Sequence, residues 1–287
     1  MPPKVKLLGI CGSPIEKGNT QKILEYSLEG ARKLQNVETA IFTSAKKKFG
    51  SCTHCNWCMF KGGQGKYCAV QDDLQPLFPM VLDADAILFA SPVYISRMSG
   101  YTAAIIDRLR AFMFGKLRGS IKNKVCGSIS VAWYRHGGVE TSGLSIYMSA
   151  FCLEMIPVSV HHSGAFYGAG AVSSIGGDGT FDPADKVQVL KDDWGMKGAR
   201  DIAIRMVELA RLLKAGMMSL CQEGTDTHIL SISPLAREVW ASKGLALPQP
   251  GQEEINYQSE SAAKMKGSGR TGYKRPETKK SNSSKKR

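Results

Sequence analysis

The chain has 287 residues, of which 43% are hydrophobic, so it is long enough to bury a substantial core. No stretch approaches about 20 uninterrupted apolar residues, and the N-terminus leads into a strand pattern without a signal-peptide cleavage region, so we expect a cytoplasmic protein with no membrane span. The net charge of +13 is concentrated at residues 264–287, where ten Lys and Arg stand against Glu277 alone, so the charge does not make the main domain a nucleic-acid binder.

Apolar runs and helical periodicities alternate along the first 213 residues. We expect strands at residues 4–10, 37–43, 86–91, 124–132 and 156–161, and helices at 20–34, 73–82, 100–114, 141–153 and 194–213. This alternation, without tight hairpin signals, predicts an α/β fold with a doubly wound five-stranded parallel sheet and helices on both of its faces.

The helix expected at 73–82 contains two prolines. We expect Asp72 or Asp73 near its N-cap and Pro76 in its first turn, where proline is tolerated. Pro79 then falls inside the helix, which is a local misfit.

The composition of the sequence divides the chain into three regions. Residues 1–214 form the main domain and include a cysteine-bearing loop at 50–70, while residues 215–260 form an extension with a helix near 234–243. Residues 261–287 form a basic tail that is almost free of apolar side chains and is expected to be disordered. Such a tail can attach to nucleic acid or another anionic partner, but solvated charge is the commoner case.

Four cysteines lie close together in the pattern C-x2-C-x2-C-x9-C. Three thiols at such short spacing, with a fourth further along, favour an iron-sulfur cluster over zinc, whose four-cysteine sites are usually built from two separated pairs. A glycine-rich spacer at 59–67 lets the last cysteine return to the others. Zinc and free thiols remain the alternatives. The metal ligands expected are Cys52, Cys55, Cys58 and Cys68.

Three loops are expected at the carboxyl edge of the sheet, where ligands of such folds bind. The loop after the first strand places hydroxyl, amide and backbone N–H donors at a helix N-terminus, which suits a phosphate group held by neutral donors. The other two loops offer aromatic rings and glycines that allow a flat ring system to approach. The candidate residues are Ser13, Pro14, Gly18, Asn19, Thr20, Ser91, Pro92, Val93, Tyr94, Gly137 and Gly138.

These motifs together closely resemble the iron-sulfur flavoproteins, a group within the NADPH-dependent FMN reductase superfamily of flavodoxin-like proteins. The resemblance covers residues 4–213 and rests on residues 12–14 and 18–20, the four cysteines, residues 72–73, 84–86 and 91–94, and the glycine pair 137–138. The spacer of nine residues before Cys68 is longer than is general in that family.

The resemblance implies a flavodoxin-like fold and bound FMN. It places Ser13, Asn19 and Thr20 at the FMN phosphate, residues 92–94 along the ring system, and the glycine pair over it. It further implies a [4Fe-4S] cluster on the four cysteines and a homodimer or homotetramer.

Three functions are open at this point. The leading one is an FMN-dependent oxidoreductase that passes electrons between FMN, the cluster and a soluble donor or acceptor such as ferredoxin. The second is an NAD(P)H-dependent FMN or quinone reductase in which the cluster is structural or absent. The third is a zinc-binding protein associated with nucleic acid, and it predicts a protein without flavin colour.

Overall fold

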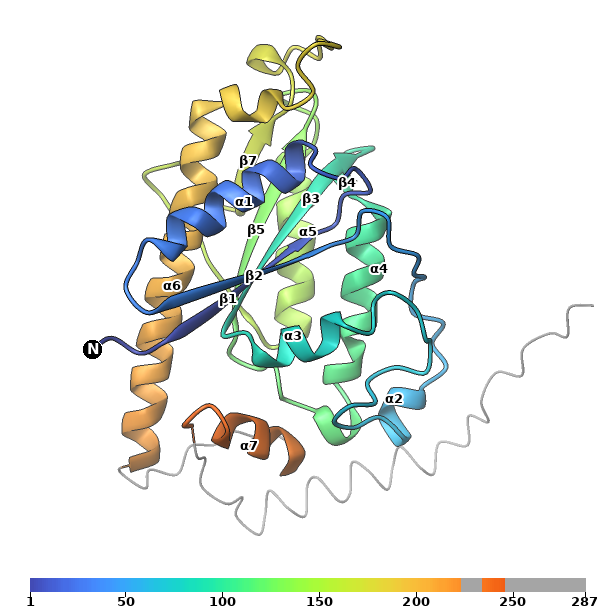
Figure 1. The fold of residues 1–287 in the computed structure, drawn as a ribbon, viewed down its shortest axis with the longest axis vertical. Coiled ribbons are helices and arrows are strands. Elements are labelled where there is room, and N and C mark those ends of the chain that lie inside the picture. The colour runs from blue at the N-terminus through green and yellow to red at the C-terminus, as the bar shows by residue number, and fades with distance from the viewer. Residues whose placement is uncertain (223–233, 246–287) are drawn as a thin grey trace, which may run out of the picture.

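The computed structural model describes residues 1–222 and 234–245, in which helices cover both faces of one sheet (Figure 1). The strands are β1 (Val5–Cys11), β2 (Val37–Thr43), β3 (Ala86–Tyr94), β4 (Arg97–Met98), β5 (Val125–Ala132), β6 (Ile156–Pro157) and β7 (Ala169–Val172). The α-helices are α1 (Asn19–Arg32), α2 (Trp57–Phe60), α3 (Leu77–Asp83), α4 (Gly100–Arg108), α5 (Val139–Cys152), α6 (Asp193–Gln222) and α7 (Pro234–Ala241). Short 3-10 helices are η1 (Leu109–Phe112), η2 (Gly115–Leu117), η3 (Ile175–Gly177) and η4 (Gln188–Lys191).

The central strands pair in parallel in the order β2-β1-β3-β5-β6, which confirms the doubly wound sheet. All eight residues of β5 are buried, as are the first seven of β3. Strands covered on both faces read as continuous apolar runs, which is why these two were recognisable in the sequence. Since β1 has β2 on one side and β3 on the other, the strand order reverses beside β1.

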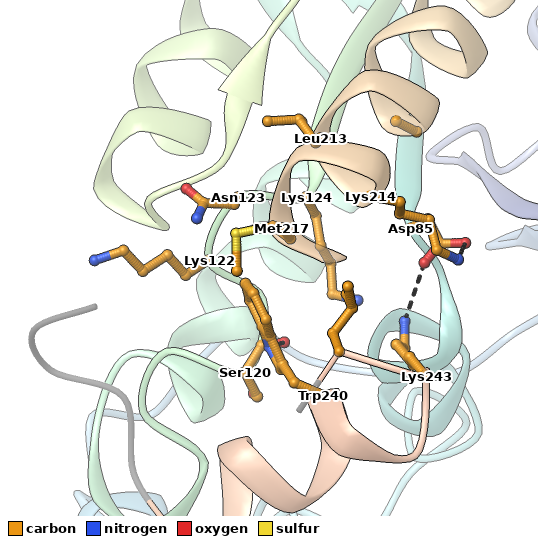
Figure 2. A pocket seen from close by; sticks show the side chains of 12 residues that line it. Asp85, Ser120, Lys122, Asn123, Lys124, Leu213, Lys214, Met217, Trp240 and Lys243 are labelled. Carbon is orange, nitrogen blue, oxygen red and sulfur yellow. Dashed lines mark hydrogen bonds and ion pairs between the residues drawn. The ribbon is translucent and has the colours of Figure 1, made fainter. Parts of the chain in front are cut away.

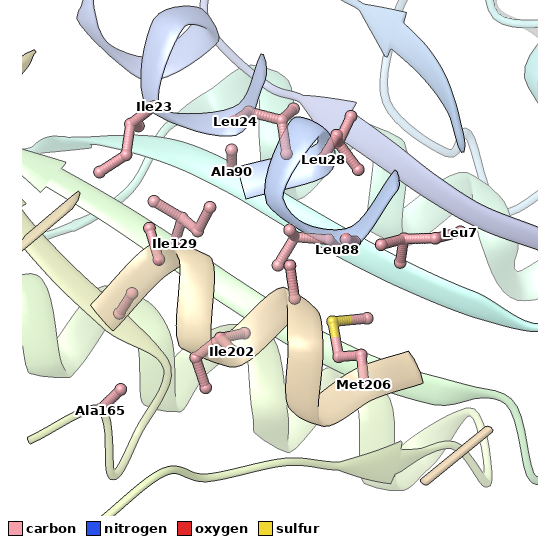
Figure 3. Packing of buried hydrophobic residues seen from close by; sticks show 14 of the residues in the cluster. Leu7, Ile23, Leu24, Leu28, Leu88, Ala90, Ile129, Ala165, Ile202 and Met206 are labelled. Carbon is pink, nitrogen blue, oxygen red and sulfur yellow. The ribbon is translucent and has the colours of Figure 1, made fainter. Parts of the chain in front are cut away.

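Two cores lie on opposite faces of the sheet. On one face, Leu24 of α1 and Ile202 of α6 belong to a cluster that packs against Leu88 of β3 (Figure 3). On the other, Phe78 of α3 and Ile105 of α4 belong to a second cluster. Helices on both faces are therefore held by apolar burial.

The helix expected at 73–82 starts four residues late. Residues 73–76 form turns, α3 begins at Leu77, and Asp72 accepts from the N–H groups of Leu74 and Gly50 instead of capping it. The later start explains Pro79, which falls in the first turn of α3, where backbone N–H groups have no intrahelical acceptor.

The fifth strand was only partly predicted. The expected strand at 156–161 is reduced to the two residues of β6, and the four-residue β7, which the sequence analysis missed, pairs in parallel with the later half of β5. Residues 158–168 form the connection between them and contain a bridge between Val160 and Ala165. The edge of β5 is thus shared by two short strands.

Two helices differ in length from the expectation. The helix expected at 100–114 ends at Arg108 and continues as η1, whereas α6 runs on to Gln222. The proposed boundary at residue 214 therefore falls within a continuous helix. The tail at 261–287 lies outside the described residues. Over the described chain, no helix combines the length and apolarity needed to cross a membrane.

The helix α7 of the C-terminal extension packs on its own chain, at the end of the sheet away from the strands' carboxyl ends (Figure 1). Trp240 is buried, and its indole N–H donates to the Ser120 carbonyl over 3.4 Å. Lys243, just after α7, donates to the carbonyls of Asp83 and Ala84, each at 2.9 Å. Its ammonium also lies 3.5 Å from a carboxylate oxygen of Asp85 (Figure 2).

Asp85 gives this region a specific pH dependence. Burial alone would raise its pKa, but Lys243 and Lys214 and the N–H of Lys6 outweigh burial and hold the pKa of Asp85 below its ordinary value. A carboxyl group with a lowered pKa in the folded protein stabilises it above the ordinary pKa, and this stabilisation is lost as the pH falls through the folded-state pKa.

We therefore expect Asp85→Asn to lower the free energy of unfolding by about 2 kcal/mol at pH 7 and by progressively less as the pH falls below 4. Urea unfolding of both proteins between pH 7 and pH 2.5 measures the difference. A difference that stays constant across this range would show that the carboxylate charge contributes nothing.

Candidate cofactor sites

The loop after β1 ends at the start of α1. The N-cap residue Gly18 has no side chain to bond the first N–H groups of α1, so these donors are available to an anion. Ser13 is buried, and its hydroxyl accepts from the N–H of Ile15 over 3.2 Å. Thr20 is also buried. Binding of a phosphate by this loop, with Ser13 and Thr20, stays a prediction.

Asn19 has a structural function that the sequence did not show. Its amide nitrogen donates to the carbonyl of Lys186 over 3.1 Å, and its amide oxygen accepts from the N–H of Val189 over 2.9 Å. The side chain therefore fastens the segment that carries η4 to the start of α1. Its role at a phosphate stays a prediction.

The loop after β3 is fixed by three buried hydroxyl groups. Ser99 caps α4 by accepting from the N–H of Thr102, and it donates to the carbonyl of Gly12 over 2.6 Å. Ser91 accepts from the Ser99 N–H and from the Thr102 hydroxyl, at 2.9 and 3.0 Å. Gly12 has no space for a side chain, because a Cβ would lie 1.9 Å from the Thr102 hydroxyl oxygen. The first and second edge loops are therefore locked together.

The same loop turns sharply between β3 and β4. Ile95 and Ser96 have φ of 49° and 58°, the left-handed region that β-branched residues rarely adopt. Pro92 is buried and Val93 half-buried, whereas Tyr94 at the strand end is exposed. Burial, together with Tyr101 and Cys11, raises the pKa of Tyr94. This hairpin presents an aromatic side chain at the edge of the sheet.

The loop after β5 closes against that hairpin. Gly138 has φ of 104°, and a Cβ on it would lie 2.6 Å from the Ser96 Cα. A Cβ on Gly137 would lie 2.9 Å from the Tyr134 carbonyl oxygen. All three expected loops therefore meet at one edge; Gly138 is needed for the approach to the hairpin, and Gly137 for the turn of its own loop.

A fourth segment at this edge was missed. The Ser174 hydroxyl donates to the Trp133 carbonyl over 2.6 Å, and Arg135 donates through Nε and Nη2 to the carbonyl of Gly176. Trp133 and Tyr134 lie with ring centroids 5.8 Å apart and are about half exposed. Residues 173–179 carry no apolar period, so only their contacts reveal their position.

Of the four clustered cysteines, Cys58 lies in the short helix α2 and the other three lie in the loop segments on either side of it. Cys58 and Cys68 pack against the core, and Cys55 is exposed. Burial raises the pKa of Cys58, and the charge of Arg110 opposes this. Every cysteine whose side chain the structure describes is a free thiol. Over the described residues, however, no group of three or more His, Cys, Asp and Glu side chains is arranged to hold a metal ion.

Arg108 holds both ends of the cysteine loop. Its buried guanidinium donates to Asp72 over 2.8 Å, to the carbonyl of Gly50 over 3.1 Å and to that of Val70 over 3.2 Å. Burial would raise the pKa of Asp72, but the bond to Arg108 and N–H donors outweigh it and lower that pKa. One arginine on α4 therefore pins the residues that precede Cys52 and follow Cys68.

The edge loops and the cysteine loop sit at opposite ends of α4. Ser99 at its N-terminus contacts the first edge loop, and Arg108 at its C-terminus contacts the cysteine loop. Nine helical residues span about 13 Å. Phe49, which precedes the cysteines, also packs edge-to-face on Tyr101 near the start of α4, with centroids 5.9 Å apart. The two candidate sites therefore belong to one connected unit.

The fold and this edge define a flavodoxin-like oxidoreductase, and comparison with known proteins identifies the family. Residues 5–165 match the NADPH-dependent FMN reductase family. An iron-sulfur flavoprotein of Methanocaldococcus jannaschii is 30% identical over 210 residues, which are 73% of this chain and 100% of the relative. An iron-sulfur flavoprotein of Archaeoglobus fulgidus is 31% identical over 210 residues, 73% of this chain and 98% of the relative.

The chain therefore belongs to the NADPH-dependent FMN reductase family, among its iron-sulfur flavoproteins, and is an FMN-dependent oxidoreductase. Among solved structures, RosB with a bound riboflavin-phosphate intermediate superposes with a TM-score of 0.55 at 15% identity, over 80% of this chain and 92% of RosB. This likeness confirms the fold.

Proposed function

We propose that this protein is an iron-sulfur flavoprotein that exchanges electrons between FMN, a [4Fe-4S] cluster and a soluble carrier such as ferredoxin. The proposal is carried by α4, because one end of this helix contacts the FMN-type edge loops and the other end, about 13 Å away along the helix, contacts the cysteine loop. Bound FMN would supply the two-electron chemistry, and the cluster the one-electron chemistry.

The residues at the carboxyl edge of the sheet fit an FMN site. The uncapped N–H groups of α1 and the hydroxyl of Ser13 suit the phosphate, as does Thr20. The hairpin that ends in Tyr94 and the glycines 137–138 leave backbone and an aromatic ring to contact the flat ring system. These residues bind and orient the cofactor; none is assigned as an acid or base.

The donor set at the cysteine loop fits a cluster in chemistry. Four free thiols lie in one segment whose ends are fixed by Arg108, and the glycine-rich spacer allows this segment to close on a cluster. The names of the relatives point to the same group.

Substitution of one cysteine tests the cluster. We expect anaerobically purified protein to contain about four iron atoms and four sulfides per chain, as a [4Fe-4S] cluster requires. Cys58→Ser should lose this iron and keep its FMN, because the edge loops do not depend on the thiols. The matched control is Cys152→Ser, since Cys152 is an exposed thiol on α5 away from the cluster loop. Zinc in place of iron, or full iron in Cys58→Ser, would contradict the proposal.

The second candidate is an NAD(P)H-dependent FMN or quinone reductase in which the cluster is structural or absent. It is favoured by the match of residues 5–165 to the NADPH-dependent FMN reductase family. Stopped-flow reduction of the flavin by NADPH and by reduced ferredoxin separates the two. Rapid NADPH turnover by Cys58→Ser, with no dependence on ferredoxin, would favour this second function.

We also propose a homo-oligomer. Leu144, Met148 and Phe151 form an exposed apolar stripe along α5, spaced for one helix face. A second copy of the chain would bury it. Light scattering of the FMN-loaded protein measures the mass, and a monomer at micromolar concentration would contradict the oligomer.

A further inference from the structure

One buried donor beside the cysteines has no partner. Arg110, in η1, donates through Nη2 to the Met59 sulfur over 3.3 Å, and its guanidinium lies over the Phe114 ring, 5.1 Å from the centroid. Its other terminal nitrogen, Nη1, is buried and has no hydrogen-bond partner among the described residues. A buried N–H of a charged group is costly to leave unpaired, so such an atom indicates a missing acceptor.

Arg110 lies on the side of η1 that faces the cysteine segment. Met59 follows Cys58 directly, and both carbonyls lie against Gly115, where an added Cβ would be 2.7 Å from each oxygen. Because Arg110 Nη2 bonds the sulfur of Met59, the residue after Cys58, the guanidinium lies beside the segment that carries Cys58.

Arg108 also has one buried nitrogen without a partner, Nε, but its terminal nitrogens differ from those of Arg110 in what they bond. The terminal nitrogens of Arg108 bond Asp72 and two carbonyls, so that arginine is committed to the ends of the loop. Arg110 has no carboxylate among its hydrogen-bond or ion-pair partners in the described chain, so its positive charge is available to sulfur.

We propose that Arg110 is a positioning residue whose Nη1 donates to the sulfur held at Cys58 and whose charge raises the reduction potential of the cluster. This inference rests on the proposed function. Reduction adds one electron to the cluster, and no bond forms or breaks. A fixed positive charge and a hydrogen bond to sulfur both stabilise the more negative, reduced state.

The test is a dithionite titration of the full-length, FMN-loaded and iron-reconstituted protein, followed by electron paramagnetic resonance of the reduced cluster. Three variants are compared: Arg110→Met removes charge and donors, Arg110→Gln removes the charge, and Arg110→Lys keeps it. Arg32→Met, an exposed arginine on α1, is the matched control.

We expect Arg110→Met and Arg110→Gln to lower the reduction potential of the cluster by at least about 59 mV, which for one electron is a tenfold change in the reduction equilibrium. Arg110→Lys and Arg32→Met should stay close to the unsubstituted protein. If the two uncharged variants lose iron and Arg110→Lys retains it, the cluster depends on the positive charge at position 110, which also supports the proposal.

Equal potentials in Arg110→Met and Arg32→Met, at equal iron content, would overturn the role of Arg110 and leave the cluster in place. Loss of iron from all three Arg110 variants would also overturn it, because the guanidinium would then serve assembly of the site and not its potential. Absence of iron from the unsubstituted protein would instead defeat the proposed function.

Discussion

Arg108→Met is expected to lower the free energy of unfolding by about 3–5 kcal/mol, the usual cost of removing one partner of a buried ion pair. The side chain of Arg108 is 1% exposed, and its loss removes the charged partner of Asp72 and a donor to the carbonyls of Gly50 and Val70. For a chain of this size, this predicts a fall in melting temperature of roughly 6–20 °C. The cysteine loop should also lose its anchor and bind less iron.

Thermal unfolding and iron analysis of the same preparations measure both effects. Arg108→Lys should recover only part of the stability, since an ammonium cannot reproduce the planar fork that reaches a carboxylate and two carbonyls. Arg32→Met, which breaks an exposed pair with Glu29 and exposed hydrogen bonds to the Thr39 hydroxyl, should change the melting temperature little. Equal melting temperatures for Arg108→Met and Arg32→Met would show that the buried pair contributes no net stability.

Gly138→Val is expected to weaken FMN binding ten- to a hundredfold, because strain of about 1–3 kcal/mol in the left-handed region adds to a steric clash. The φ of Gly138 is 104°, and the clash is with the Ser96 backbone, which a side-chain movement cannot relieve. The loop after β5 would have to move away from the hairpin, and the edge that the cofactor needs would open. Quenching of FMN fluorescence on titration with apoprotein gives the affinity.

Gly100→Ala is the matched control. Gly100 lies on the same edge at the start of α4, and an added Cβ there meets no atom within 4 Å. Its FMN affinity should equal that of the unsubstituted protein. If Gly138→Val bound FMN equally well while folding normally, the close approach of the two loops would have no part in holding the cofactor.

Much of the fold could be predicted because its central strands are buried on both faces. The continuous apolar runs of β3 and β5 are recognisable as buried strands, and the helices of the domain show apolar residues at helical spacing. By contrast, β7 has only four small residues, and its place is decided by pairing with Ile129 to Ala132 of β5. Long-range pairing of this kind leaves no local signal.

The candidate site was predictable in its backbone and less so in its side chains. Loops at the carboxyl ends of parallel strands must share an edge, so the positions of residues 12–20, 91–100 and 132–141 followed from topology. The bond of Asn19 to the segment at 186–189 joins residues about 170 apart and could not be foreseen. Arg108 did leave a signal, since it follows Ile105 by three residues on the buried side of α4.

The helices α1 and α6, which are almost the first and the last elements of the domain, lie together on one face of the sheet (Figure 1), and Gly30 of α1 packs against Arg200 of α6. A nascent chain therefore carries β1, β3 and β5 with one apolar face only partly covered, by α1, until α6 is synthesised. The segment that Asn19 fastens lies just ahead of α6 and is also made late. The first edge loop therefore reaches its final contacts only when the last part of the domain has been made.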